Sequence, residues 1–187
     1  MLDRRVYIIG GGNMGAAIAE GLLDDDINNC QLINIVDSDK KLKKIIQFHG
    51  PAALSSGKNQ TLFQMLVRTV IGQQLSVKAA QSIHYKLSNL LIGRISPKRF
   101  IGLNKKQLRQ CGLSSNKIET LINIAQLFLE KEFPSKNLLE SFSDEEFEDL
   151  LIQIKGIGKW TCDIVKLFHL CRFDTFPEGD LGVRNGF

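Results

Sequence analysis

The sequence predicts a mainly helical protein in two parts: a short β-α-β fragment over residues 1–46, followed by an all-helical domain over residues 47–187. Apolar residues alternate between strand-like and helix-like spacing near the N-terminus, and they recur at helical spacing almost throughout beyond residue 60. Charge divides at the same point. The chain carries 6 basic and 7 acidic residues up to Ile46, and 18 basic and 13 acidic residues from Gln47 onward.

The surplus of positive charge therefore lies in the second part, which accounts for the net charge of +4 at pH 7. Such a surplus favours a polyanionic partner, because a protein that neutralises phosphates releases their counterions. A basic surface that only faces solvent is the alternative.

Composition indicates a globular protein with a substantial core, because 43% of the 187 residues are hydrophobic. The apolar stretch 6–23 is interrupted by five glycines, Asn13 and Glu20. We therefore expect no membrane span and no secretory signal there, and a cytoplasmic protein. The four cysteines are dispersed, which predicts reduced thiols and no metal or iron–sulfur site held by side chains.

The first 46 residues predict a strand over 5–9, a helix over 14–23 and a second strand over 31–36. A G-x-G-x-x-G run of Gly10, Gly12 and Gly15 joins the first strand to the helix, where it would let a pyrophosphate approach the helix N-terminus. Asp37 follows the second strand, in position to accept a hydrogen bond from a ribose hydroxyl.

This start resembles that of pyrroline-5-carboxylate reductase over about 45 residues, along Ile8-Ile9-Gly10-Gly11-Gly12-Asn13-Met14-Gly15 and the helix after it. Neither a third strand nor a substrate domain follows the helical run 40–48. Two parallel strands cannot bury both faces of a sheet, so we expect a vestigial Rossmann-like fragment that does not bind NAD(P). A fragment of an NAD(P)-dependent reductase is the alternative.

From residue 60 the predicted helices begin at recognisable start signals. Apolar residues share a face over 63–70 and again over 79–87, on either side of a break at 72–76. Ser96-Pro97, Asn104, Ser114 and Ser143 each precede a further helix, and capping-box spacing occurs at Asn104 and Ser143. The expected ranges of the two long later helices are 117–133 and 147–154.

A glycine hairpin, Lys155-Gly156-Ile157-Gly158-Lys159, separates the last of these helices from one expected over 160–170. Two glycines one residue apart allow backbone amides to turn outward at a helix N-terminus, which forms a nest for a phosphate between Lys155 and Lys159. A plain turn between helices is the alternative. Asp180 follows 21 residues after Lys159.

Residues 48–187 resemble the 3-methyladenine DNA glycosylase II family of the helix-hairpin-helix superfamily, through spaced runs at 48–51, 66–80, 111–114, 154–161 and 176–184. The resemblance implies a monomeric enzyme of base-excision repair that binds double-stranded DNA and hydrolyses the N-glycosidic bond of alkylated bases. The resemblance also implies that the reaction requires no cofactor. An inactive DNA-binding helix-hairpin-helix module is the alternative.

Asp180 matches the acidic residue of the superfamily's loop rich in glycine and proline. Cleavage of the bond develops positive charge on the deoxyribose, which a carboxylate can stabilise, or the carboxylate can orient the attacking water. Asp180 is also expected to cap a helix that begins at Leu181. The capping and catalytic roles are compatible with each other.

Trp160 occupies the position at which bifunctional members carry a lysine that forms a Schiff base. An indole cannot act as that nucleophile, so the resemblance implies hydrolysis without strand cleavage. The ring suits a pocket for cationic alkylated bases, and a core tryptophan that braces the hairpin is the alternative.

The break at 72–76 matches the loop that fills the stack when a base is extruded, with Gln74 or Leu75 as the wedge. Hairpins of this class also hold a monovalent cation through carbonyls, here those of Ile152, Ile154 and Ile157. Family members continue beyond the position of Phe187, so we expect an incomplete C-terminal wall and impaired activity.

Overall fold

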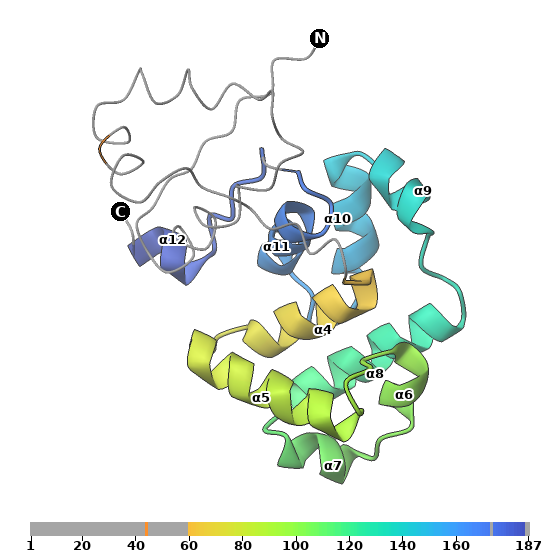
Figure 1. Cartoon of the computed structure of the whole chain (residues 1–187). Coiled ribbons are helices and arrows are strands. Elements are labelled where there is room, and N and C mark those ends of the chain that lie inside the picture. Colours follow the sequence, from red (N-terminus) through yellow and green to blue (C-terminus); the bar gives the residue numbers. More distant parts are fainter. Residues whose placement is uncertain (1–43, 45–59, 173, 186–187) are drawn as a thin grey trace. The chain divides into compact units, whose positions relative to one another are not determined.

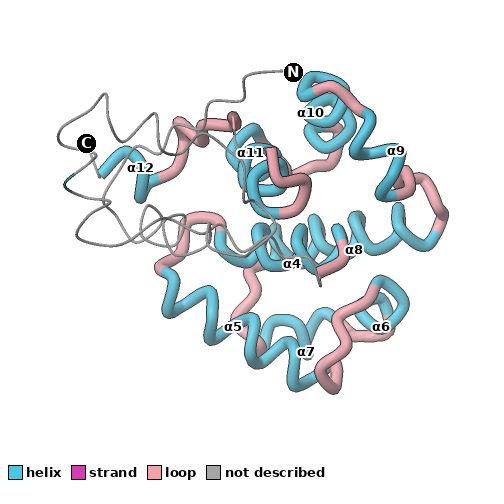
Figure 2. The backbone as a smooth tube through the Cα atoms, turned by 45° about the horizontal axis from the view of Figure 1, so that its top comes forward, coloured by secondary structure: helices cyan, strands magenta, loops and turns pink. Residues whose placement is uncertain are grey.

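A computed structural model describes residue 44, residues 60–172 and residues 174–185. The predicted β-α-β fragment, including Gly10, Gly12, Gly15 and Asp37, lies outside the described residues. The chain divides into two units, one of residues 59–165 and one of residues 1–58 with 166–187. No strand occurs among the described residues, in agreement with the predicted mainly helical fold (Figure 2).

The described helices have between 5 and 15 residues, and the longest connection between consecutive helices, residues 169–180, joins α11 to α12 (Figure 1). They are α4 (Leu62–Gly72), α5 (Val77–Leu90), α6 (Pro97–Ile101), α7 (Lys105–Gln110), α8 (Ser115–Leu129), α9 (Lys136–Ser141), α10 (Asp144–Ile152), α11 (Lys159–Phe168) and α12 (Leu181–Asn185). None of them is long and apolar enough to cross a membrane.

Side-chain caps explain why several helices begin where they do. The predicted capping boxes are present at Asn104, which starts α7, and at Ser143, which starts α10; Thr61 forms a third at α4. Each box satisfies two backbone donors that a helix N-terminus would otherwise leave without partners. Ser76 and Ser114 cap α5 and α8 through their hydroxyl groups.

Helix α8 is the centre of the larger unit, because it packs against α4, α6 and α7, while α4 also packs against α5. The core between these helices is apolar and includes a group of aromatic rings. Phe63 of α4 meets Phe100 and Phe128 edge to face, with ring centroids 6.2 and 5.5 Å apart. Such pairs stabilise the core beyond the area they bury.

The predicted helix over 117–133 ends four residues early, at Leu129, because the chain forms a Schellman motif there. Lys131 has a left-handed φ of 59°, and the amide of Glu132 donates to the carbonyl of Leu127 at 3.1 Å. Phe133 then folds back and stacks on Phe128 at 4.3 Å. The short helix α9, which follows, was not predicted.

Candidate nucleic-acid interface

The predicted hairpin lies between α10 and α11, and backbone hydrogen bonds define its shape. The amide of Ile157 donates to the carbonyl of Ile154 at 2.9 Å, and the amide of Thr161 donates to the carbonyl of Gly158 at the same distance. Ile154 and Ile157 are buried and anchor the turn. The hairpin that the sequence predicts is therefore a tight turn that leads directly into the first turn of α11.

The two glycines of the hairpin differ in their backbone conformation and in their surroundings. Gly156 has a φ of 92°, and a Cβ atom there would collide with the hydroxyl of Thr120. Gly158 has no left-handed φ, and a Cβ atom there would have nothing within 4 Å. Internal packing thus requires Gly156, whereas the bare backbone of Gly158 leaves open space for an approaching ligand.

Two side chains from outside the hairpin hold its carbonyl groups. Thr120 of α8 donates from its hydroxyl to the carbonyl of Lys155 at 2.9 Å. Gln73, at the C-terminus of α4, donates from its side-chain amide to the carbonyl of Gly156 at 3.0 Å and to the hydroxyl of Thr161 at 3.1 Å. These contacts give the carbonyls of Lys155 and Gly156 partners within the protein. A phosphate nest formed by the amides of the turn stays a prediction.

The two lysines that flank the hairpin differ in their surroundings. The side chain of Lys155 is 89% exposed, and its Nζ lies 4.0 Å from a carboxylate oxygen of Glu119. Lys159 has two carboxylates near its Nζ, Glu148 at 3.4 Å and the buried Asp163 at 3.7 Å. A phosphate would meet less competition at Lys155 than at Lys159.

The α4–α5 loop carries the predicted wedge residues in an exposed and strained conformation. Gln74 has a left-handed φ of 55°, which is uncommon for a residue other than glycine, and its neighbour Leu75 is 40% exposed. Gln73, immediately before them, turns its side chain to the hairpin instead. The loop thus divides its residues between an anchor and an exposed tip.

Lys117 of α8 holds the base of the same loop. Its Nζ donates to the carbonyls of Ile71 and Gln73, each at 2.8 Å. These carbonyls end α4, whose last turn contains no basic residue of its own, so the cation satisfies acceptors at the negative end of the helix. Burial lowers the pKa of Lys117 from its ordinary value.

Only some of the residues that hold the hairpin and the α4–α5 loop together could be predicted from the sequence. Lys117 and Thr120 were not singled out, because their partners lie more than 30 positions away along the chain. Their spacing on one helix, three residues apart, places both on the same face of α8 and is the single signal that could have found them. Trp160 is the second residue of α11 and is half-buried.

Asp180 belongs to the other unit and is the N-cap of α12, as the sequence predicts. Its Oδ1 accepts a hydrogen bond from the amide of Val183 at 3.0 Å, and its carbonyl accepts one from the amide of Arg184 at 2.9 Å. The residue is 6% exposed.

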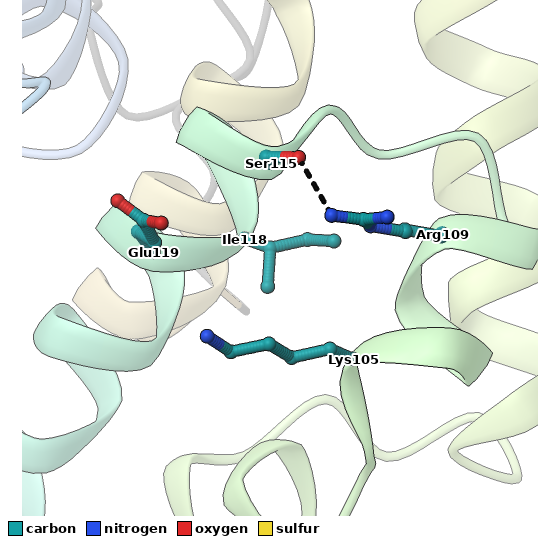
Figure 3. Close-up of a pocket in the computed structure, with 5 residues that line it drawn as sticks. All are labelled: Lys105, Arg109, Ser115, Ile118 and Glu119. Carbon is teal, nitrogen blue, oxygen red and sulfur yellow. Dashed lines mark hydrogen bonds between the residues drawn. The ribbon is translucent and has the colours of Figure 1, made fainter.

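Other candidate sites in the described ranges are weak. A hollow between α7 and α8 is lined by Lys105, Arg109, Ser115, Ile118 and Glu119 (Figure 3), but it encloses only about 30 Å³, room for about one water and too little for a purine. Arg109 donates to the hydroxyl of Ser115 there at 3.0 Å. No group of three His, Cys, Asp or Glu residues in the described part could hold a metal.

Comparison with known proteins relates this arrangement to enzymes of DNA repair. Residues 67–187 match the family model of the HhH-GPD superfamily base excision DNA repair protein. DNA-3-methyladenine glycosylase 1 of Schizosaccharomyces pombe is 34% identical over 150 residues, which cover 79% of this chain and 65% of that protein. The chain thus spans just under two thirds of that relative's length.

Solved structures give the same result. The 3-methyladenine DNA glycosylase Mag1 of Schizosaccharomyces pombe, in complex with abasic DNA, has a TM-score of 0.76 and 31% identity, covering 82% of this chain and 76% of that one. DNA-3-methyladenine glycosidase of Bacillus halodurans has a TM-score of 0.65 and 31% identity, covering 79% of this chain and 67% of that one.

Proposed function

Because the chain belongs to the HhH-GPD superfamily of base excision DNA repair proteins, we propose that it is a DNA glycosylase that removes alkylated bases of the 3-methyladenine and 7-methylguanine type. The observation that carries the proposal is the glycine hairpin with an open Gly158, in a chain whose relatives are 3-methyladenine DNA glycosylases. Abasic DNA, bound in the similar Mag1 structure, is the product such a hydrolysis leaves.

The hairpin and the α4–α5 loop would bind the duplex together. Amides of the turn and the exposed Lys155 would hold a phosphate, with Lys159 as a second contact after it leaves its carboxylates. Gln74 or Leu75, at the exposed tip of the loop, would enter the stack as the base is extruded. In this proposal, Gln73 anchors the loop and takes no part in the wedge.

Asp180 would act on the bond to the extruded base. As the base leaves, the bonding electrons go with it, and positive charge develops on the deoxyribose. A carboxylate lowers the free energy of that state, or accepts a proton from the attacking water. The N-cap contact that Asp180 makes with Val183 would fix the position of the carboxylate.

Trp160 supports hydrolysis without strand cleavage, since no amine stands at that position to form a Schiff base. Its half-buried ring would stack on the extruded base, and a cationic alkylated base would gain from the ring face. The reaction needs only water as co-reactant, so we propose that no cofactor is required. A monovalent cation at the carbonyls of Ile152, Ile154 and Ile157 stays a prediction, which activity in potassium against choline chloride would test.

Three broader expectations belong to the same proposal. Residues 1–46 form a separate fragment that binds no NAD(P), residues 47–187 form the glycosylase domain, and the protein is a cytoplasmic monomer. Titration of NADPH fluorescence at millimolar cofactor tests the first. Cell fractionation and sedimentation test the last.

Release of 3-methyladenine from alkylated duplex DNA tests the proposed function directly. We expect free base and abasic sites in equal amounts, with strand breaks only after alkali treatment. A DNA-binding module without activity would bind the duplex and yield no abasic sites. Strand breaks without alkali would contradict the monofunctional assignment.

A further inference from the structure

Three segments of the larger unit are joined in a closed circuit of hydrogen bonds through α8. Lys117 connects α8 to the base of the α4–α5 loop, and Thr120 connects α8 to the hairpin. Gln73 closes the circuit by joining the loop to the hairpin directly. Each of the three segments is therefore held by the other two.

Lys117 has the most demanding position in this circuit. Its ammonium group donates to both Ile71 and Gln73, so it fixes the carbonyls on either side of Gly72, where α4 gives way to the loop. Its backbone is fixed as well, because its amide donates to the capping hydroxyl of Ser114. The side chain thus holds the start of the loop at a fixed position relative to α8.

Gln73 transmits this placement in two directions. Its carbonyl accepts from Lys117, while its side-chain amide donates to the hairpin at Gly156 and to the first turn of α11 at Thr161. The next residue is Gln74, with its left-handed backbone. A displacement of Gln73 would therefore move the exposed tip of the loop and release the hairpin at the same time.

We propose that Lys117 is a positioning residue for base extrusion, which sets the tip of the α4–α5 loop in register with the phosphate-holding hairpin so that phosphate binding and wedge insertion occur together. This inference rests on the proposed function. Lys117 itself touches neither the base nor the sugar in this scheme, because two of its three donors hold backbone carbonyls at the base of the loop. Gln73 is the coupling element between the two surfaces.

Comparison of duplex with single-stranded substrate separates positioning from a general defect, since a single strand needs no extrusion from a duplex. Lys117→Met keeps the length of the side chain and removes its donors. We expect it to lower the ratio of duplex to single-strand excision rates by at least roughly tenfold, because a misplacement of about 1 Å in a site can cost about 10²-fold. Gln73→Met should do the same, and Lys106→Met, an exposed lysine of α7, should leave the ratio unchanged.

A double variant identifies the element on which Lys117 acts. If Lys117 serves by placing the wedge, adding Lys117→Met to a variant with both Gln74→Ala and Leu75→Ala should reduce the duplex rate no further, because the effects of coupled residues are not additive. Independent losses that multiply would overturn the proposal. A general structural defect would instead reduce the single-strand rate in proportion.

Wedge insertion can also be observed without catalysis. A duplex with 2-aminopurine beside a tetrahydrofuran abasic analogue should change its fluorescence when wild-type protein binds. Lys117→Met should bind with nearly the same affinity and give little of that change. If wild-type protein released no base from either substrate, the proposed function would be wrong. The fluorescence change would still test whether Lys117 positions the loop. An equal fluorescence change with both proteins, or none with wild type, would overturn the positioning role.

Discussion

The hydroxyl group of Thr120 occupies the space that a side chain at Gly156 would need, and it donates at 2.9 Å to the carbonyl of the preceding residue, Lys155. One side chain of α8 thus fixes the hairpin by contact and by hydrogen bonding. The other glycine of the hairpin has no such neighbour.

Gly156→Ala should destabilise the protein by about 2 kcal/mol or more, because it adds a clash with Thr120 to a left-handed backbone that alanine adopts poorly. Gly158→Ala should change the free energy of unfolding by less than about 0.5 kcal/mol and still weaken DNA binding, since its methyl group would enter the space of the phosphate. Urea denaturation and fluorescence anisotropy with duplex DNA measure the two quantities. Unchanged affinity in Gly158→Ala would argue that the turn serves packing alone.

Lys155→Ala should weaken binding to duplexes of any sequence and reduce the slope of log K against log salt by about 1, as expected for one lost phosphate contact. The side chain is 89% exposed, so folding stability should hardly change. Lys98→Ala, at an exposed position of α6, is the matched control. An identical salt slope for both variants would remove Lys155 from the interface.

Asp180→Asn separates the two roles of this residue, because asparagine keeps the capping oxygen that accepts from Val183 but carries no charge. We expect the melting temperature to stay close to that of the wild type, while the excision rate falls by roughly 10²-fold or more. Single-turnover release of 3-methyladenine measures the rate. Full activity in the variant would show that Asp180 caps α12 and takes no part in the reaction.

The stability of the protein should fall as the pH drops below about 6.5, in part because of His84 on α5. Burial lowers the pKa of His84 below its ordinary value of 6.5, and the charge of Arg68 contributes. Since the unfolded chain then binds the proton more readily than the folded one, stability is lost from pH 6.5 down to the folded pKa. His84→Gln should show a weaker pH dependence in this range by urea denaturation. If the free energy of unfolding of the two proteins changed equally with pH, His84 would not be a source of this pH dependence.

Some elements of the fold could be predicted from the sequence, and others could not. Local signals were sufficient for the helix starts, since the capping boxes at Asn104 and Ser143 involve partners three residues apart. The hairpin was predicted by its glycines, and the cap at Asp180 by its place before Leu181. The early end of α8 was missed, because it depends on the left-handed Lys131 and on Phe133 stacking back on Phe128.

Tertiary structure alone decided which of the candidate residues act together. The sequence treated Gln73 and Gln74 as one loop, and only the fold turns the first to Gly156 and leaves the second exposed. It likewise distinguishes the two glycines of the hairpin and brings in Lys117 from a helix more than 40 residues away. Spacing along the chain reports on neighbours within a turn or two, whereas these contacts depend on how α4, α8 and the hairpin pack.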